Sequence, residues 1–453
     1  MRVCLVMPPN VKWVEPFLSA AKKPPAVQFG FPIGLGYLAA VLREDGHDVK
    51  LLDASFDDLS MGETISEILL FKPDLVGISI TTHFLRTAVK LADVLHDWGI
   101  KTVAGGVHAT YDYRALNEYF DWIVEGEGEA AIRALCSGIS HIPTNCNLVD
   151  NTIKDLDELP YPARDLVDFD RYIHNYGSLK NCVDVVSSRG CTNRCAFCSS
   201  GHFFGKWRPR SPERVMAEIA YLKGTYSRIR SVNFFDDNFT ANKERVMVMC
   251  DLIHGDFKWS CLGRVDQIDK EMARAMGDAG CIRVHLGIES GSPAILARIN
   301  KRITLPQARM TVKNLRDNGV ETVSFFMVGH PGESKESLHS TYRFAKELRS
   351  TNTLFSVAQV FPGTALEKLQ PQDNWLGYLY EPEVKRPSIY AHPCIPNFIP
   401  EGFTREDLKG YAKMLNLRLS IISVLRNPSL LFKRLFTSPM QIWNLITKLL
   451  EET

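Results

Sequence analysis

Two successive series of short apolar runs separated by helical patterns constrain the fold of this 453-residue chain more than any other feature. Strands that alternate with helices form parallel sheets whose two faces are covered by the helices. The first series, residues 1–137, therefore predicts a doubly wound, Rossmann-like domain of the α/β class. We expect its strands at residues 3–7, 49–53, 75–81, 102–104 and 122–124, and its helices at 34–44, 64–71, 85–98, 115–120 and 129–135.

The second series, residues 181–365, predicts a barrel-like sheet. Six strand-helix units are too many for a small sheet and too few for a closed eight-fold barrel, so a partial (β/α)6 barrel fits. Residues 138–180 show little periodicity and are expected to form a linker, and residues 366–453 a mostly helical C-terminal region. The strands of the second series are expected at 183–187, 231–235, 259–262, 284–288, 322–328 and 354–361.

The charge and hydropathy of the chain exclude several functional classes. A formal net charge of +1 provides no basic field for nucleic acid. The first nine residues are too short an apolar stretch for a signal peptide, and no apolar run is long enough to span a bilayer, so we expect a cytoplasmic protein with mostly reduced thiols. The last segment predicts a helix that packs onto the barrel or makes a peripheral membrane contact. This helix begins at Ser438-Pro439, and its apolar face is formed by Ile442, Ile446, Leu449 and Leu450.

Cys191, Cys195 and Cys198 directly follow the first strand of the second series, at the end where barrels carry their chemistry. Three thiolates on one loop can hold one metal centre and leave a coordination position free for a reactant. These cysteines alone leave open a structural zinc site and a disulfide-bonded loop. The other cysteines show no second spacing of this kind and are expected to be ordinary buried or free thiols, with Cys182 close to the loop in sequence.

The carboxyl ends of the strands in the first series carry glycines and polar residues. Ligands of doubly wound sheets bind at this edge, and glycine lets a bulky ligand lie against the backbone. Glycine alone more often indicates a tight turn, and a histidine at a strand end is more often a structural residue. The candidate ligand-binding residues at this edge are Ser79, Thr81, Gly105, Gly106, His108 and Glu127.

The cysteine loop and three later strand ends resemble those of radical S-adenosylmethionine (SAM) enzymes. The loop has an aromatic residue, Phe197, just before its third cysteine, and the later matches lie at residues 234–240, 287–292 and 326–334. Residues 1–435 further resemble the subgroup in which a cobalamin-binding domain precedes the barrel. The features that match this subgroup lie at residues 34–39, 46–49, 79–81, 105–108 and 125–129.

One departure from many cobalamin domains concerns the ligand of the cobalt. Those domains carry an Asp-x-His-x-x-Gly loop after the first strand, whose histidine ligates cobalt, whereas residues 8–31 here contain no histidine. The resemblance therefore implies that the lower face of a bound cobalamin is empty or is met by water or a non-histidine group.

The resemblance implies a 4Fe-4S cluster held by Cys191, Cys195 and Cys198, with SAM bound at the fourth iron through its methionyl amine and carboxylate. An electron from the cluster would cleave SAM to a 5′-deoxyadenosyl radical, so an external donor such as flavodoxin or ferredoxin is implied. Cobalamin is the third implied cofactor. The protein groups mainly position and shield these cofactors.

The resemblance also assigns roles to residues at the barrel strand ends. Glu289 or Ser290 would bind the ribose hydroxyls of SAM, and Val328-Gly329 would contact the adenine. Asp236 or Asp237 would hold the methionyl amine, because a carboxylate suits an ammonium group. For each of these acids, a helix N-cap or a surface ion pair is the structural alternative.

Two further cationic positions lie in the second series. Arg264, after the third barrel strand, would pair with a carboxylate of the substrate or cofactor, or else structurally with Asp266 or Glu289. Lys301-Arg302 is expected to be a solvated helix turn.

The implied function is cobalamin-dependent methylation of an unactivated carbon in a small-molecule, natural-product or lipid substrate. The alternative within the same family is cyclisation, oxidation or carbon–carbon coupling of a lipid or tetrapyrrole, with or without bound cobalamin. A third hypothesis, from another class, is a metal-binding or redox partner protein without turnover, although the strand-end motifs would then have no role.

Overall fold

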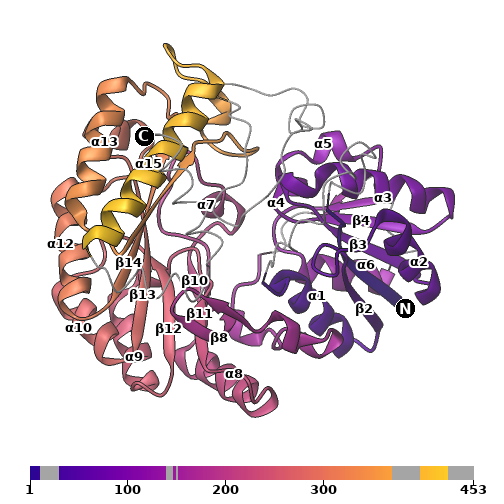
Figure 1. Cartoon of the computed structure of the whole chain (residues 1–453). Coiled ribbons are helices and arrows are strands. Elements are labelled where there is room, and N and C mark those ends of the chain that lie inside the picture. The colour runs from indigo at the N-terminus through magenta and orange to yellow at the C-terminus, as the bar shows by residue number, and fades with distance from the viewer. Residues whose placement is uncertain (11–29, 139–145, 149–151, 370–397, 427–453) are drawn as a thin grey trace.

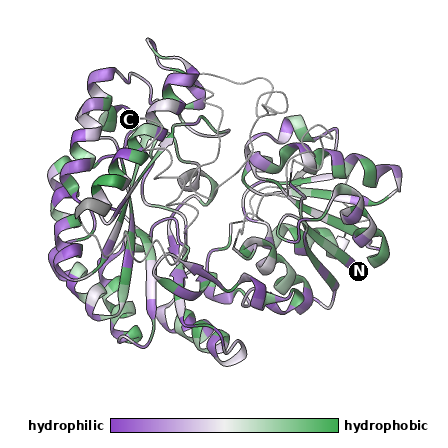
Figure 2. Cartoon of the chain, viewed as in Figure 1, coloured by the Kyte–Doolittle hydropathy of each residue, from purple (hydrophilic) through white to green (hydrophobic). Residues whose placement is uncertain are grey.

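The computed structural model describes residues 1–10, 30–138, 146–148, 152–369 and 398–426. Two α/β units lie side by side, and the chain passes from the first to the second along one edge of the molecule (Figure 1). Hydrophobic residues line the strands and the helix faces that cover them, while the outer faces of the helices are largely hydrophilic (Figure 2). This arrangement confirms the predicted α/β fold class.

The first unit is built on a six-stranded sheet in which all neighbours are parallel. The strand order reverses between β1 and β3, and doubly wound sheets bind ligands at such a switch point, outside the carboxyl ends of the strands. In spatial order the strands are β2 (Asp48–Asp53), β1 (Arg2–Met7), β3 (Leu75–Ser79), β4 (Lys101–Gly105), β5 (Trp122–Val124) and β6 (Cys146–Leu148).

The helices of the first unit agree with the sequence pattern, with one exception. The helix expected at 115–120 is replaced by two short helices that lie earlier in the chain, α4 (Val107–Tyr111) and α5 (Tyr113–Leu116). The backbone N–H of Thr110 bonds to the carbonyl of Gly106, so helical structure begins directly at the glycine turn. The remaining helices are α1 (Ile33–Glu44), α2 (Met61–Phe71), α3 (Leu85–Asp97) and α6 (Glu129–Gly138).

The second unit is an open, barrel-like sheet with six parallel strands and one antiparallel edge strand. The six parallel strands confirm the predicted partial barrel. The antiparallel strand β7, like β6, lies in the segment expected to be a linker. In spatial order the strands are β15 (Asn352–Val357), β14 (Glu321–Val328), β13 (Cys281–Glu289), β12 (Lys258–Gly263), β11 (Ser231–Phe234), β8 (Leu179–Val185) and β7 (His174–Tyr176).

Helices cover the outer side of this sheet (Figure 1). They are α8 (Pro212–Thr225), α9 (Lys243–Ile253), α10 (Lys270–Asp278), α11 (Pro293–Arg298), α12 (Leu305–Asp317) and α13 (Lys335–Leu348). A further helix, α15 (Arg405–Arg426), lies against the edge strand β15, where Asn416 bonds to the N–H and the C=O of Phe355 at 2.7 and 2.8 Å. This helix therefore protects an edge that would otherwise be open to pairing with another chain.

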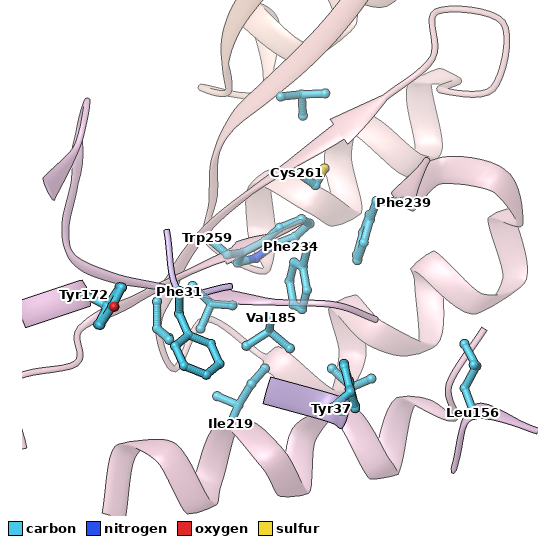
Figure 3. Close-up of a cluster of buried hydrophobic side chains, with 14 of the residues drawn as sticks. Phe31, Tyr37, Leu156, Tyr172, Val185, Ile219, Phe234, Phe239, Trp259 and Cys261 are labelled. Carbon is cyan, nitrogen blue, oxygen red and sulfur yellow. The ribbon is translucent and has the colours of Figure 1, made fainter. Parts of the chain in front are cut away.

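One hydrophobic core continues from the first unit into the second. Phe31, before α1, packs edge-to-face on Tyr172, with 5.7 Å between the ring centroids. Within the barrel, Phe234 packs on Trp259 at 5.5 Å, and Val185 of β8 belongs to the same buried cluster (Figure 3). Apolar side chains of both units are therefore buried together.

No helix within the described ranges combines the length and apolar character needed to cross a membrane. The helix expected from Ser438-Pro439, with its apolar face of Ile442, Ile446, Leu449 and Leu450, lies outside the described residues.

A buried histidine in the barrel predicts a loss of stability in acid. His285 of β13 lies between the rings of Tyr176 and Phe325, and burial, with a smaller effect of Arg283, lowers its pKa from 6.5 to about 3. The unfolded chain therefore takes up a proton below about pH 6.5 that the folded chain does not, so the free energy of unfolding falls as the pH falls, until about pH 3. At pH 5 the loss from this group is about 2 kcal/mol. Chemical denaturation at pH 7.5 and pH 5 should show a smaller pH dependence for His285→Phe than for the wild type, and an equal dependence would contradict this assignment.

Candidate active site

The three-cysteine loop lies between two short elements, β9 (Ser188–Arg189) and α7 (Ser200–Phe203), and β9 pairs antiparallel with β10 (Arg208–Pro209). Its backbone is attached to the barrel at several points. The N–H of Ala196 bonds to the carbonyl of Ile299 at 2.8 Å, and the carbonyl of Ala196 accepts from Leu366 at 3.0 Å. These bonds fix the middle of the loop at the carboxyl end of the barrel.

The thiols of the loop are available to a metal centre. All three cysteines are free, with Cys195 buried and the other two partly exposed, so no disulfide forms in the loop. In the described part of the chain, no three His, Cys, Asp or Glu side chains converge as the ligands of one ion. A single zinc would require all its thiolates within about 2.3 Å of the metal, whereas a cluster spreads them over different irons.

A cation lies beside the buried cysteine. Nη1 of Arg264 is 3.7 Å from Sγ of Cys195, and the same guanidinium bonds to both carboxylate oxygens of Asp266 at 2.9 and 3.0 Å. The ion pair with Asp266 was one of the two alternatives expected from the sequence. An N–H donor and a positive charge therefore lie within reach of this sulfur.

The two candidate aspartates support the ends of β9 and the start of the cysteine loop. Asp236 is buried and accepts three bonds of 2.6 Å, from the N–H and hydroxyl of Ser187 and from the hydroxyl of Ser188. Asp237 accepts from the N–H of Gly190 at 3.1 Å, and burial raises its pKa. In the structure both carboxylates are therefore engaged by the segment that leads into the loop.

Glu289 ends β13 and forms a buried ion pair with Lys301, with 2.8 Å between Oε1 and Nζ. Lys301 is 6 % exposed, so the expectation of a solvated turn at this position is wrong. Its ammonium lies 5.6 Å from the ring centroid of Phe197 in the cysteine loop. A side chain at Gly287 would place its Cβ 2.5 Å from Oε1 of Glu289, so the pair would have to shift.

The end of β14 continues the same site. Glu333 accepts from the N–H of Gly329 at 3.2 Å. The ring of His330 lies 6.2 Å from that of Phe197, and burial, with Lys301 nearby, lowers the pKa of His330 to about 4. Ser290, the other candidate for the ribose of SAM, is instead 3.1 Å from the hydroxyl of Thr341. The structure thus brings Phe197, Glu289 and the Gly329 turn together around the cysteine loop and places Ser290 toward α13.

The candidate ligand-binding edge of the first sheet has an open and a closed part. Ser79, Thr81, Gly105 and Gly106 are partly exposed, and a Cβ on Gly106 would lie 2.8 Å from the carbonyl of Ile80. Glycine at position 106 therefore serves the close packing of this turn on the backbone of Ile80, as the tight-turn interpretation describes, while the partly exposed residues leave the edge accessible.

His108 belongs to the closed part of this edge. It is buried, with Nδ1 3.1 Å from the hydroxyl of Thr82 and Nε2 3.4 Å from Asp112, as the structural alternative describes.

The contacts between the two units include residues that sequence reasoning missed. Glu127, expected at a ligand, and its neighbour Glu129 both bond to Arg189, which lies two residues before Cys191. Tyr111 of α4 donates to the carbonyl of Ser199, directly after the third cysteine. The run of glutamates at 125–129 and the arginine next to the loop are visible in the sequence, but nothing local indicates that they meet.

Family models match both units of the chain. Residues 26–136 match the model described as a B12 binding domain, and residues 185–345 match the Radical SAM superfamily. An uncharacterised methyltransferase of Pyrococcus horikoshii is 33% identical in an alignment of 403 positions that covers 83% of this chain and 84% of that protein. The chain is a cobalamin-binding radical SAM protein. This membership confirms the resemblance inferred from the motifs.

Other relatives in this family are named for different reactions. An anaerobic magnesium-protoporphyrin IX monomethyl ester cyclase of Rubrivivax gelatinosus is 30% identical over 70% of this chain and 62% of its own length. A hopanoid C-3 methylase of Methylococcus capsulatus is 25% identical over 80% of this chain and 71% of its own length. Among solved structures, the methyltransferase TsrM of Kitasatospora setae, with cobalamin and a 4Fe-4S cluster bound, has a TM-score of 0.65 at 21% identity over 81% of this chain and 76% of its own. The last likeness shows a shared fold.

Proposed function

We propose that this radical SAM enzyme transfers a methyl group from cobalamin to an unactivated carbon of a small-molecule, natural-product or lipid substrate. The observation that carries the proposal is the contact between the carboxyl edge of the first sheet and the cysteine loop. Tyr111 follows β4 at that edge, and its hydroxyl is 3.1 Å from the carbonyl of Ser199. A methyl donor bound at the edge would therefore lie next to the site where SAM is cleaved.

The proposed reaction needs two sites in this chain, one for the cluster with SAM and one for cobalamin. When bound, the 4Fe-4S cluster supplies the electron that cleaves SAM, and cobalamin supplies the methyl group. Cys191, Cys195 and Cys198 would hold the cluster, with the buried Arg264 donating to the sulfur of Cys195. An external flavodoxin or ferredoxin would provide the electron.

The contacts proposed for SAM and for cobalamin use residues at the strand ends of the two sheets. The carboxylate of Glu289 would bind the ribose of SAM through Oε2, while Oε1 stays on Lys301. Backbone at Val328-Gly329 would contact the adenine. At the edge of the first sheet, Ser79, Thr81, Gly105 and Gly106 would receive cobalamin.

The proposal is tested by the products formed under reducing conditions. Protein reconstituted without oxygen with iron, sulfide and cobalamin should release 5′-deoxyadenosine and S-adenosylhomocysteine from SAM, because a second SAM remethylates the cobalt. Iron and cobalt contents and the visible spectrum report which cofactors are present. If the loaded protein forms neither 5′-deoxyadenosine nor S-adenosylhomocysteine, the proposal is wrong.

A second function in the same family is cyclisation or carbon–carbon coupling of a lipid or tetrapyrrole. The identity of 30% with a magnesium-protoporphyrin cyclase favours it. Release of 5′-deoxyadenosine without S-adenosylhomocysteine would identify this outcome.

A further inference from the structure

We propose that the first domain holds the cysteine loop at both of its ends, and that cluster assembly and cobalamin binding therefore strengthen each other. The positioning residues are Glu127 and Glu129 at the start of the loop and Tyr111 at its end. The inference rests on the proposed binding of cobalamin at the sheet edge from which these residues come.

The start of the loop is held by a buried ion-pair network. Nη1 of Arg189 is 2.6 Å from Oε1 of Glu127, and Nη2 is 2.6 Å from Oε1 of Glu129. None of these three side chains is more than 8% exposed. Two carboxylates on different nitrogens of one planar guanidinium fix its orientation as well as its position. Arg189 therefore places the backbone that leads into Cys191.

The charges in this network balance. Arg208 of β10 pairs with Oε2 of Glu127 at 2.7 Å, so two arginines of the β9–β10 hairpin face two glutamates of the first domain. The guanidinium of Arg189 also lies 4.9 Å from the ring centroid of Tyr37 in α1. Burial alone would lower the pKa of Arg189, but Glu129 and Glu127 raise it, so the cation is permanent.

The end of the loop is held by a neutral contact. The hydroxyl of Tyr111 donates to the carbonyl of Ser199, one residue after Cys198, at 3.1 Å. The tyrosine ring lies against Gly363, where an added Cβ would be 2.1 Å from Cδ1 of the ring. Burial raises the pKa of Tyr111 to about 12, so its hydroxyl keeps its proton at neutral pH.

Both contacts to the cysteine loop are made by residues that follow strands at the same edge of the first sheet. Tyr111 ends α4, which begins just after β4 and the Gly105-Gly106 turn, and Glu127 follows β5. A ligand that orders this edge also orders the contacts to the loop, and a cluster that orders the loop also orders the edge. By thermodynamic linkage, each ligand then raises the affinity for the other by the same factor.

The experiment compares cobalamin binding to the full-length protein with and without its cluster. Hydroxocobalamin is titrated into anaerobic protein, and the dissociation constant is read from tryptophan quenching. We expect the cluster-loaded wild type to bind it at least about fivefold more tightly than the cluster-free protein. In Glu129→Gln and Tyr111→Phe this ratio should fall toward one, and the iron retained per chain after gel filtration should fall as well.

A matched control separates linkage from general destabilisation. Glu321, at the amino end of β14, also pairs with an arginine, Arg283 at 2.5 Å, but it lies at the opposite end of the barrel strands from the cysteine loop. Glu321→Gln should weaken folding while leaving the ratio of the two dissociation constants unchanged. If Glu129→Gln does not fold, Tyr111→Phe, which loses one hydroxyl, still tests the second contact.

The outcomes distinguish this inference from the proposed function. Equal affinity with and without the cluster in the wild type, or an unchanged ratio in both variants, would overturn the linkage while leaving methyl transfer intact. If cobalamin binds neither the cluster-loaded nor the cluster-free protein, the proposed methyl transfer and the linkage are both wrong.

Discussion

Replacing Cys195 by alanine is expected to abolish the 4Fe-4S cluster and all cleavage of SAM. Cys195 is the buried member of the three cysteines, it lies 3.7 Å from the guanidinium of Arg264, and the loop backbone beside it is bonded to Ile299. Two remaining thiolates cannot hold a cluster that keeps one iron open for SAM. Iron and sulfide contents, the electron paramagnetic resonance signal of the reduced protein and release of 5′-deoxyadenosine should all fall to background.

The matched control for this experiment is Cys182→Ala. Cys182 is also a buried thiol, but it lies on β8 outside the loop, and burial raises its pKa to about 12. We expect this variant to keep the cluster signal and the release of 5′-deoxyadenosine. A cluster retained in Cys195→Ala, or lost equally in both variants, would contradict the assignment of the loop.

The succession of strands and helices along the chain and the place of the cysteine loop could be predicted from the sequence because both follow from local patterns. Alternation of apolar runs and helices indicates parallel strands, and the carboxyl ends of parallel strands meet at one edge. Glu289 and Gly329 were therefore expected near the loop, and the structure places them there with Phe197 between Lys301 and His330.

The contacts between distant segments could not be predicted in this way. Arg189 and Glu127 are 62 residues apart, and no periodicity records which strand end faces which loop. Lys301 was expected in solvent because a lysine next to an arginine usually is, and only its pairing with Glu289 explains its burial. The strand β6 has a polar residue, Asn147, at its centre, so it is not an apolar run and no pattern indicates it.

Replacing Glu289 by glutamine is expected to weaken SAM binding and folding at the same time. The variant loses a carboxylate that would accept bonds from the ribose hydroxyls, and hydrogen bonds to charged groups contribute about 1.5–3 kcal/mol each. The dissociation constant of SAM on cluster-loaded protein should therefore rise about 10- to 100-fold. The change also leaves the ammonium of Lys301 buried without its partner, which costs about 3–5 kcal/mol of stability.

A second substitution separates these two effects of Glu289→Gln. In Glu289→Gln/Lys301→Met both charges of the pair are removed, so no buried ion is left uncompensated, and the methionine fills a volume similar to that of lysine. We expect the double variant to recover most of the lost stability in chemical denaturation while its affinity for SAM, measured by anaerobic equilibrium dialysis, stays low. Recovery of SAM affinity together with stability would show that Glu289 serves only to neutralise Lys301, and the ribose contact would be wrong.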